Sequence, residues 1–178
     1  MITNWNGKER LQECLPSVVE AWKKTSQVSE ILVVDDASSD DSVGYLRNEF
    51  PDVRVVLNEK NLGFIGSTNR GVQEARGDIV VLLNNDVKVR EDFLVPALKH
   101  FSDRRVFAVT FQALYEDEKT FREGGKSMRF TLGFPHIRHD LRHQLQGTAY
   151  SLYAVGGHCA VRREMFLSLG GFDGLFHP

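Results

Sequence analysis

The sequence is poor in the features that mark specialised protein classes. It has only two cysteines in 178 residues, Cys14 and Cys159, and neither has the spacing of a disulfide framework or a metal site. It has no secretory signal and no apolar run near the roughly 18 to 20 residues that span a bilayer. Its formal net charge of -2 offers no basic surface for nucleic acid. We therefore expect a cytoplasmic globular domain with reduced, buried cysteines and no nucleic-acid partner.

Short apolar runs alternate with amphipathic segments along the first two thirds of the chain. After a strand that ends at Asn4, strands are expected at residues 31–34, 53–57, 79–83 and 106–114. Helices are expected between them at residues 9–24, from Ser39 or Asp40 to about 50, 61–77 with Gly77 as C-cap, and 92–101. This alternation predicts an α/β fold with a mainly parallel, doubly wound (Rossmann-like) sheet and helices on both faces. Gly63 and Gly66 lack the G-x-G-x-x-G spacing of a dinucleotide-binding loop.

The rest of the chain has a different character. Residues 115–150 are charged and glycine-rich, which predicts a long loop region or a small excursion from the sheet. Apolar residues then return at 153–161, and a short helix is expected at residues 163–169, closed by Gly170 and Gly171.

Polar clusters follow three of the expected strands, at residues 3–6, at 35–40 and at Asn84, Asn85 and Asp86. The carboxyl ends of parallel strands share one edge of a sheet, where ligands bind. Asp36 could accept hydrogen bonds from a nucleobase or a ribose, and Asp86 could hold a hard cation, Mg²⁺ or Mn²⁺, on a diphosphate. A simple turn is the alternative for Asn84, Asn85 and Asp86, and helix capping or turn formation is the alternative for Asp36. Their coincidence on one edge favours a nucleoside diphosphate pocket.

Five blocks of the chain resemble, in the same order, those of the family 2 glycosyltransferases, which have the GT-A fold. The blocks are I-T-N-W-N-G, I-L-V-V-D-D-A-S-S-D-D-S, N-L-G-F-I-G-S-T-N-R-G, L-L-N-N-D-V and V-G-G-H-C-A-V-R-R-E-M-F-L-S-L-G-G-F-D. They cover nearly the whole chain. The most similar branch contains rhamnosyltransferase-like enzymes that extend cell-surface polysaccharides.

The resemblance implies transfer of a sugar, with inversion, from a nucleotide-sugar donor to a hydroxyl of a saccharide or lipid-linked saccharide acceptor. It implies a single GT-A domain with a nucleotide-binding part at about residues 1–114 and an acceptor-side part at about 115–178. The implied nucleotide and donor contacts are Thr3, Asn4, Asp36, Asn69 and Asn84. Asp86, the last position of the family's D-x-D motif, is the implied ligand of a divalent cation, and Gly156, Gly157 and His158 line the acceptor side.

The catalytic base of the family lies just after the Gly-Gly-Phe-Asp block, and the resemblance therefore places it beyond Pro178, the last residue of the chain. Asp173 belongs to the preceding block and is not assigned as the base. We expect a fragment of a longer enzyme, truncated at both ends, which binds donor weakly and transfers little. The expected location is the cytoplasm, at the inner face of the membrane if regions outside this segment provide peripheral attachment.

Three histidines offer a second candidate site. His136, His139 and His143 would share one face of a helix, as metal ligands do. The interleaved Arg138 and Arg142 favour a solvated or acceptor-facing basic surface instead, suited to a phosphate-bearing lipid acceptor.

Two other function classes compete with the enzyme. A phosphoacceptor signalling domain also holds Mg²⁺ with acidic residues after a strand, but it would end sooner after Asp86. A non-catalytic nucleotide-sugar binding module would need no base.

Overall fold

The computed structural model describes residues 1–25, 30–117, 119–139 and 149–176. Its central sheet has the strand order β3-β2-β1-β4-β10-β5. The first four strands pair in parallel, β10 is antiparallel to both of its neighbours, and β5 therefore runs in the same direction as β4. These strands are β1 (Ile2–Asn4), β2 (Leu32–Asp35), β3 (Arg54–Leu57), β4 (Ile79–Asn84), β5 (Ala108–Thr110) and β10 (His158–Arg162). The predicted α/β fold with a mainly parallel sheet is confirmed.

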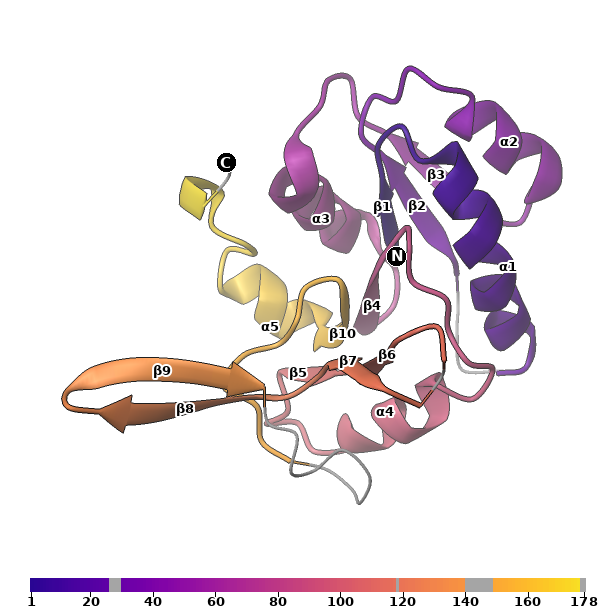
Figure 1. Ribbon diagram of the computed structural model, residues 1–178. Coiled ribbons are helices and arrows are strands. Elements are labelled where there is room, and N and C mark those ends of the chain that lie inside the picture. The colour runs from indigo at the N-terminus through magenta and orange to yellow at the C-terminus, as the bar shows by residue number, and fades with distance from the viewer. Residues whose placement is uncertain (26–29, 118, 140–148, 177–178) are drawn as a thin grey trace.

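Helices cover both faces of the sheet, as Figure 1 shows. On one face, Leu11, Leu15 and Leu46 pack from the helices onto Ile2 and Leu83 of the sheet. On the other face, Val72 and Phe166 pack onto Val34, Leu82 and Cys159. Burial of each such side chain contributes roughly 1.5 to 3 kcal/mol. The helices are α1 (Lys8–Lys23) and α2 (Ser42–Glu49) on the first face, α3 (Gly63–Glu74) and α5 (Arg163–Ser168) on the second, and α4 (Leu94–His100) near β5.

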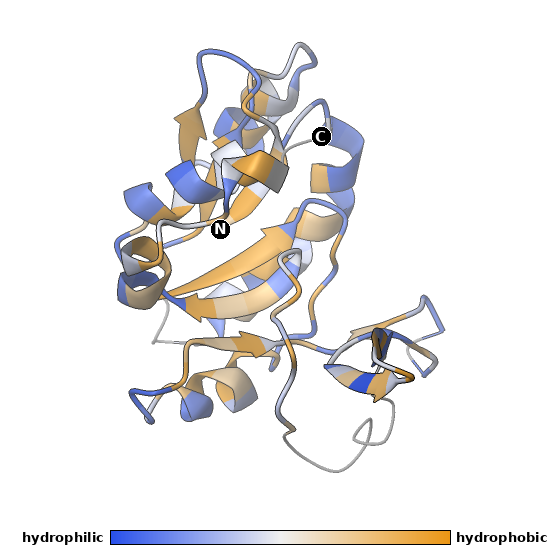
Figure 2. Cartoon of the chain, turned by 90° about the vertical axis from the view of Figure 1, so that its left-hand side faces the viewer, coloured by the Kyte–Doolittle hydropathy of each residue, from blue (hydrophilic) through white to orange (hydrophobic). Residues whose placement is uncertain are grey.

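The hydropathy of the chain follows these layers. In Figure 2 the strands of the central sheet are mostly hydrophobic and the surrounding loops are hydrophilic. Cys14 and Cys159 are free and buried, and burial raises the pKa of each thiol to about 12. In the part of the chain that the structure describes, no helix is both long and apolar enough to cross a membrane.

Several element boundaries differ from the sequence prediction. Helix α2 begins at Ser42 with Asp41 as its N-cap, although Asp40 still accepts a hydrogen bond from the Ser42 N–H at 3.0 Å. Helix α3 ends at Glu74, because Ala75 adopts an extended conformation (ψ 145°) before Gly77 is reached. The strand expected at 106–114 divides into β5 and a short hairpin strand, β6, because the regular strand is interrupted at Phe111 and Gln112.

The described residues between 113 and 139 form two small hairpins where a long loop or an excursion was expected. The first pairs β6 (Ala113–Leu114) with β7 (Phe121–Glu123), and the second pairs β8 (Lys126–Thr131) with β9 (Phe134–His139). The β8–β9 ribbon projects from the body of the protein (Figure 1). Strand β10 then returns to the main sheet between β4 and the edge strand β5, so the two expected parts of the domain share one sheet. A 3-10 turn, Gly174–Phe176, follows α5.

The described histidines do not lie on the helical face that was considered for a metal site. His136 and His139 lie on strand β9. Side chains alternate between the two faces of a strand, so the helical spacing that would align the histidines does not apply. His143 lies outside the described residues. Among the residues that the structure describes, no group of three or more His, Cys, Asp or Glu side chains could hold a metal ion.

Candidate functional site

The three polar clusters meet at the carboxyl ends of β1, β2 and β4. Thr3 pairs with Val34 on one side and with Asn84 on the other. The backbone N–H of Asp36 donates to the carbonyl oxygen of Asn4 at 2.8 Å, which holds the two loops together. The predicted common edge is confirmed.

The alternation of side chains along the strands divides these clusters into two sets. Val34 and Leu82 belong to the core under α3, and Thr3 and Asn84 are in register with these positions on the same face. Ile2 and Leu83 belong to the core under α1. Asn4 and Asp35 share that second face. Thr3 and Asn84 therefore border the α3 side of the edge, whereas Asn4 and Asp35 lie on the α1 side.

Asp35 is committed to the loop that follows it. Its carboxylate accepts hydrogen bonds from the Ser38 N–H at 2.9 Å, the Ser38 hydroxyl at 2.7 Å and the Asn4 side-chain amide at 3.0 Å. Only 2% of Asp35 is exposed. Between Asp36 and Ser38, Ala37 has a positive φ of 57°, a left-handed conformation that favours glycine. Asp35 is thus a structural carboxylate that fixes a tight turn.

Asp36 is buried but keeps one oxygen without a partner in the described structure. Its Oδ1 accepts hydrogen bonds from the Asn58 side chain at 2.7 Å and from the Leu62 N–H at 2.8 Å. Asn58 also donates to the Ser67 hydroxyl at 2.8 Å and accepts from Arg70 at 2.8 Å. The sequence analysis missed Asn58, although it is a further polar residue directly after a strand, β3. This network fixes the carboxylate at the start of α3.

Asn4 does not have the free side chain expected of a donor contact. It is 2% exposed, and its Oδ1 accepts a hydrogen bond from the Asn85 amide at 2.9 Å while its Nδ2 donates to Asp35. Gly7 packs against this pair, since a Cβ there would lie 2.2 Å from Nδ2 of Asn85 and 2.5 Å from Oδ1 of Asn4. Asn4 therefore connects the loops after β1, β2 and β4 from behind the edge.

The end of β4 is the open part of the site. Residues 84–87 form a turn in which the Val87 N–H donates to the Asn84 carbonyl at 3.4 Å. The side chains of Asn84 and Asp86 make no hydrogen bond or ion pair with the described residues, and Asp86 is exposed. One free carboxylate beside a free amide suits a hard cation that takes its other ligands from water and a diphosphate. The turn interpretation and the metal interpretation of this cluster are compatible.

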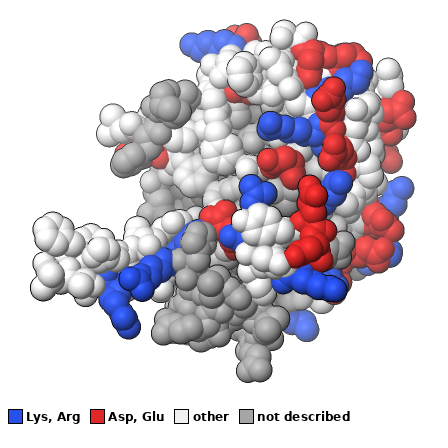
Figure 3. Space-filling model, viewed as in Figure 1, with Lys and Arg blue, Asp and Glu red and all other residues white. Residues whose placement is uncertain are grey.

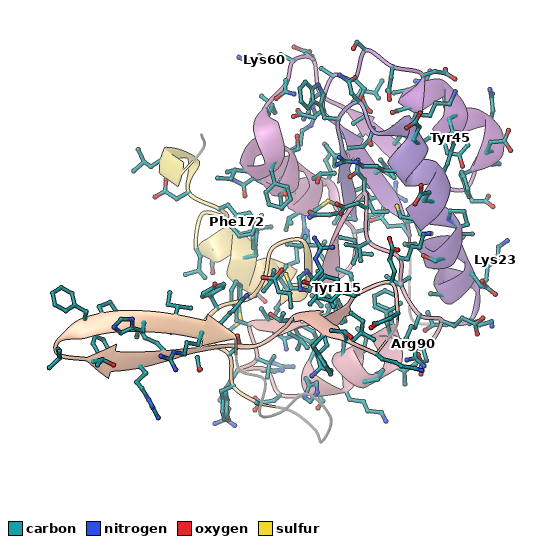
Figure 4. The ribbon with its side chains drawn as sticks, viewed as in Figure 1. Lys23, Tyr45, Lys60, Arg90, Tyr115 and Phe172 are labelled. Carbon is teal, nitrogen blue, oxygen red and sulfur yellow. The ribbon has the colours of Figure 1, made fainter. Side chains whose placement is uncertain are left out.

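The side-chain amide of Asn69, an expected donor contact, is hydrogen-bonded to the backbone of Phe172. Its Nδ2 donates to the Phe172 carbonyl and its Oδ1 accepts from the Phe172 N–H, both at 2.8 Å. Figure 4 shows Phe172 between α3 and α5. Its ring is 5.2 Å from that of Phe166 and 6.3 Å from that of Phe64. Asn69 therefore fastens the segment after α5 to α3, where Gly171 (φ 77°) makes the close approach.

The three residues expected on the acceptor side lie next to the end of β4. The Asn84 N–H donates to the Gly157 carbonyl at 2.9 Å, and a Cβ on Gly157 would lie 2.5 Å from Nδ2 of Asn84. Gly156 is less crowded, with its nearest neighbour at 3.4 Å. His158 is 8% exposed and its Nε2 has no hydrogen-bond partner. Burial lowers the pKa of His158, despite the opposing charge of Glu123, so its imidazole is neutral at pH 7.

The segment after α5 holds no residue that we assign as the catalytic base. Asp173 is exposed, and its Oδ1 accepts a hydrogen bond from the Leu175 N–H at 2.9 Å, which is a local turn contact at the start of the 3-10 turn. Pro178, beyond which the family resemblance places the base, lies outside the described residues. The position of the base therefore stays a prediction.

An apolar cavity of about 310 Å³ lies at the opposite edge of the sheet, beside Ile31, Asp78 and Ile79. It is near the amino ends of β2 and β4. The polar groups that could bind a diphosphate are therefore at the other end of the strands, not in this cavity.

The fold and the open carboxyl edge define an α/β protein of the ligand-binding, doubly wound class. The sequence matches glycosyl transferase family 2 over residues 1–170, and the chain belongs to this family. The predicted family is thereby confirmed, while its rhamnosyltransferase-like branch stays a prediction.

Relatives and solved structures agree with this membership. The chain is 28% identical to N-acetylgalactosaminyltransferase 6 of Drosophila melanogaster over 160 residues, which cover 82% of the chain and 24% of that protein. It is similar in fold to GalNAc-T7 in a structure with UDP, GalNAc and Mn²⁺ (TM-score 0.69, 22% identity), covering 97% of this chain and 36% of that one. It is also similar in fold to the mannosyltransferase PcManGT from Pyrobaculum calidifontis in a structure with GDP-Man and Mn²⁺ (TM-score 0.65, 22% identity). That match covers 97% of this chain and 46% of PcManGT. The chain thus spans less than half of each of these proteins.

Proposed function

We propose that this chain provides the nucleotide-sugar site of a glycosyltransferase that transfers a sugar, with inversion, to a hydroxyl of a saccharide or lipid-linked saccharide in cell-surface polysaccharide synthesis. The observation that carries the proposal is the open end of β4. There the side chains of Asn84 and Asp86 have no partners in the described structure, and Asn84 is in register with Thr3 on β1. The anchored carboxylate of Asp36 follows β2 at the same edge of the sheet. Inversion and the polysaccharide role rest on the family resemblance.

Each residue of the edge has a distinct task in this proposal. The free oxygen of Asp36 accepts hydrogen bonds from the nucleoside, and Thr3 borders the same pocket. Asp86 holds a divalent cation, Mg²⁺ or Mn²⁺, and the Asn84 amide contacts the donor or a water on that cation. The cation, when bound, stabilises the charge that develops on the leaving diphosphate. Asn4 and Asn69 act indirectly, by holding the loops in place.

A titration tests the proposal directly. Calorimetry of the chain with UDP, GDP and dTDP, each with and without Mn²⁺, should show metal-dependent binding of one nucleotide. Asp86→Ala should weaken that binding by at least about 100-fold, because loss of even an outer-shell partner of a metal ligand costs roughly 10- to 100-fold. Asp52→Ala is the matched control, because Asp52 is an exposed carboxylate before β3, at the opposite edge of the sheet. Equal effects of the two substitutions, or no nucleotide binding by the folded chain, would refute the assignment.

The two other classes are distinguished by further measurements on the same protein. A nucleotide-sugar binding module would bind the nucleotide but release no nucleoside diphosphate from the sugar donor in the presence of acceptor, even when the segment is extended to include the predicted base. A phosphoacceptor domain would incorporate phosphate from acetyl phosphate at Asp36 or Asp86 and would bind no nucleotide.

A further inference from the structure

The β8–β9 ribbon has two chemically different faces. Cross-strand pairing places Met128 opposite Ile137 and Phe130 opposite Pro135 on one face. Arg129 opposite His136 and Arg138 opposite Ser127 are on the other face. Met128, Phe130 and Ile137 are 43%, 63% and 55% exposed, so nothing in the described structure covers the apolar face. The ribbon is an amphipathic element without a partner.

The tip of the ribbon is also apolar, although the backbone conformation of its turn favours small polar residues. Thr131 pairs with Phe134, and the two residues between them, Leu132 and Gly133, have positive φ angles of 51° and 84°. Such a turn favours Asn or Asp followed by Gly, and a bulky side chain there is disfavoured. Leu132 is nevertheless 93% exposed, and Phe134 is 71% exposed. Intramolecular packing therefore does not explain an apolar residue at this position.

The charge of the ribbon has a single sign. Residues 124–139 contain three Lys or Arg residues and no Asp or Glu, although the whole chain has a net charge of -2. Lys126 is buried and paired with Glu123, whereas Arg129 and Arg138 are exposed and have no ion-pair partner in the described structure. Figure 3 shows the ribbon with an uncharged end and basic side chains behind it.

We propose that the β8–β9 ribbon is a membrane-contact element that inserts Leu132 and Phe134 into the interface of an anionic bilayer. The inference rests on the order of side chains along the ribbon, with an apolar tip followed by basic residues. This order matches that of a bilayer surface, where the apolar interior is followed by the lipid phosphates. At about 3.4 Å per residue, Arg129 lies about 10 Å behind Leu132. That distance matches the roughly 5 to 10 Å to which interfacial apolar groups are buried, and it leaves Arg129 at the level of the lipid phosphates. Arg138, opposite Ser127, lies further from the tip, on the aqueous side of the phosphates. The proposal goes beyond the nucleotide-sugar site and does not depend on it.

Vesicle flotation tests the assignment. The chain should float with vesicles of 70% phosphatidylcholine and 30% phosphatidylglycerol, and at least about ten-fold less with pure phosphatidylcholine, since each arginine contributes about five-fold near an anionic surface. Combined Arg129→Ser and Arg138→Ser substitution should lower binding to the anionic vesicles by about 25-fold. A salt concentration of about 0.5 M should weaken binding of the wild type by screening.

The tip substitution separates membrane contact from folding. Leu132→Asn should lower vesicle binding by about ten-fold, because an apolar side chain is lost, yet it should not destabilise the ribbon, because Asn suits the positive φ. Leu169→Asn is the matched control, since Leu169 is 71% exposed after α5, away from the ribbon. Similar losses for Leu132→Asn and Leu169→Asn would overturn the proposal, as would absence of wild-type binding to the anionic vesicles.

Two further readouts keep the outcomes distinct. If sedimentation shows that the wild type is a dimer and that Leu132→Asn is a monomer without change in vesicle binding, the apolar tip contacts a second copy and the membrane assignment is wrong. Nucleotide titration of each ribbon variant should match the wild type. Loss of vesicle binding with intact nucleotide binding therefore bears on the ribbon alone, and failure of nucleotide binding in every variant bears on the proposed function alone.

Discussion

The polar clusters after β2 and after β4 are similar in sequence but opposite in structure. Asp35 and Asp36 are 2% and 4% exposed, and their carboxylates accept hydrogen bonds from neighbouring loops. Asp86 is exposed, and Asn84 beside it has no side-chain partner among the described residues. The first cluster builds the edge of the sheet, and the second is left open at that edge. A polar residue after a strand can therefore be part of the scaffold or part of the site, and its hydrogen bonds distinguish the two.

The largest expected effect on stability comes from removing a carboxylate of the hydrogen-bonded cluster after β2. Asp35→Ala should lower the free energy of unfolding by about 3 kcal/mol, because the Ser38 N–H and the Asn4 amide lose their acceptor inside the protein. Asp86→Ala should change it by less than about 0.5 kcal/mol, since its exposed side chain has no hydrogen-bond or ion-pair partner among the described residues. Urea denaturation measures both. Equal losses of stability would show that the two clusters do not differ in this way.

Asn69 holds the segment after α5 by hydrogen bonds, as Asp35 holds the loop after β2. Asn69→Ala removes both hydrogen bonds to the Phe172 backbone and should lower the free energy of unfolding by about 2 kcal/mol. Asn48→Ala is the control, because Asn48 is an exposed asparagine on α2 with no such contacts. The two variants can be compared by urea denaturation. Loss of nucleotide binding in Asn69→Ala without loss of stability would instead favour the direct donor contact that the family resemblance implied.

Substitution of the two adjacent glycines before β10 tests the role of the exposed cluster after β4, because a methyl group on one of them would crowd Asn84. A methyl group on Gly157 would lie 2.5 Å from the Asn84 amide, whereas one on Gly156 would lie 3.4 Å from the Phe172 ring. Neither glycine has a positive φ. Gly157→Ala should therefore displace Asn84 and weaken nucleotide binding by about ten-fold, a loss of roughly 1.4 kcal/mol, and Gly156→Ala should have little effect. Calorimetry measures nucleotide binding by both variants, and a larger loss of affinity in Gly156→Ala than in Gly157→Ala would contradict the prediction.

The smallest expected effect concerns the pH dependence of stability at His158. Burial lowers the pKa of His158 below its usual 6.5, so the unfolded chain binds the proton more readily. Acidification through 6.5 should therefore lower the free energy of unfolding, and His158→Leu should reduce this loss. The buried α-amine of Met1, whose pKa burial lowers to about 5, affects both proteins alike. Denaturation at pH 7.5 and pH 5.5 measures the difference between them, and identical slopes would contradict the prediction.

The sequence predicts the layers of this protein but not all of its boundaries. Apolar runs such as residues 79–83 are short and β-branched, so they indicate buried strands without any tertiary information. Helix α3 ends at Glu74 and not at Gly77, because the path of the chain into β4 decides where the helix stops. The ribbon at residues 126–139 was expected to be a loop or an excursion, since its alternation of apolar and basic residues is meaningful only once the strand pairing is known.

The candidate site shows the same division. Sequence alone determined that polar groups follow three strands of a parallel sheet, and parallel strands necessarily bring those groups to one edge. Only the tertiary structure decided which of them remain available, because hydrogen bonds such as those of Asn4 with Asp35 and Asn85 join residues 31 and 81 positions apart. Asn4 and Asn84 are the same amino acid at the ends of neighbouring strands. They lie on opposite faces of the sheet, and long-range packing, which no local pattern specifies, buries the first and leaves the second open.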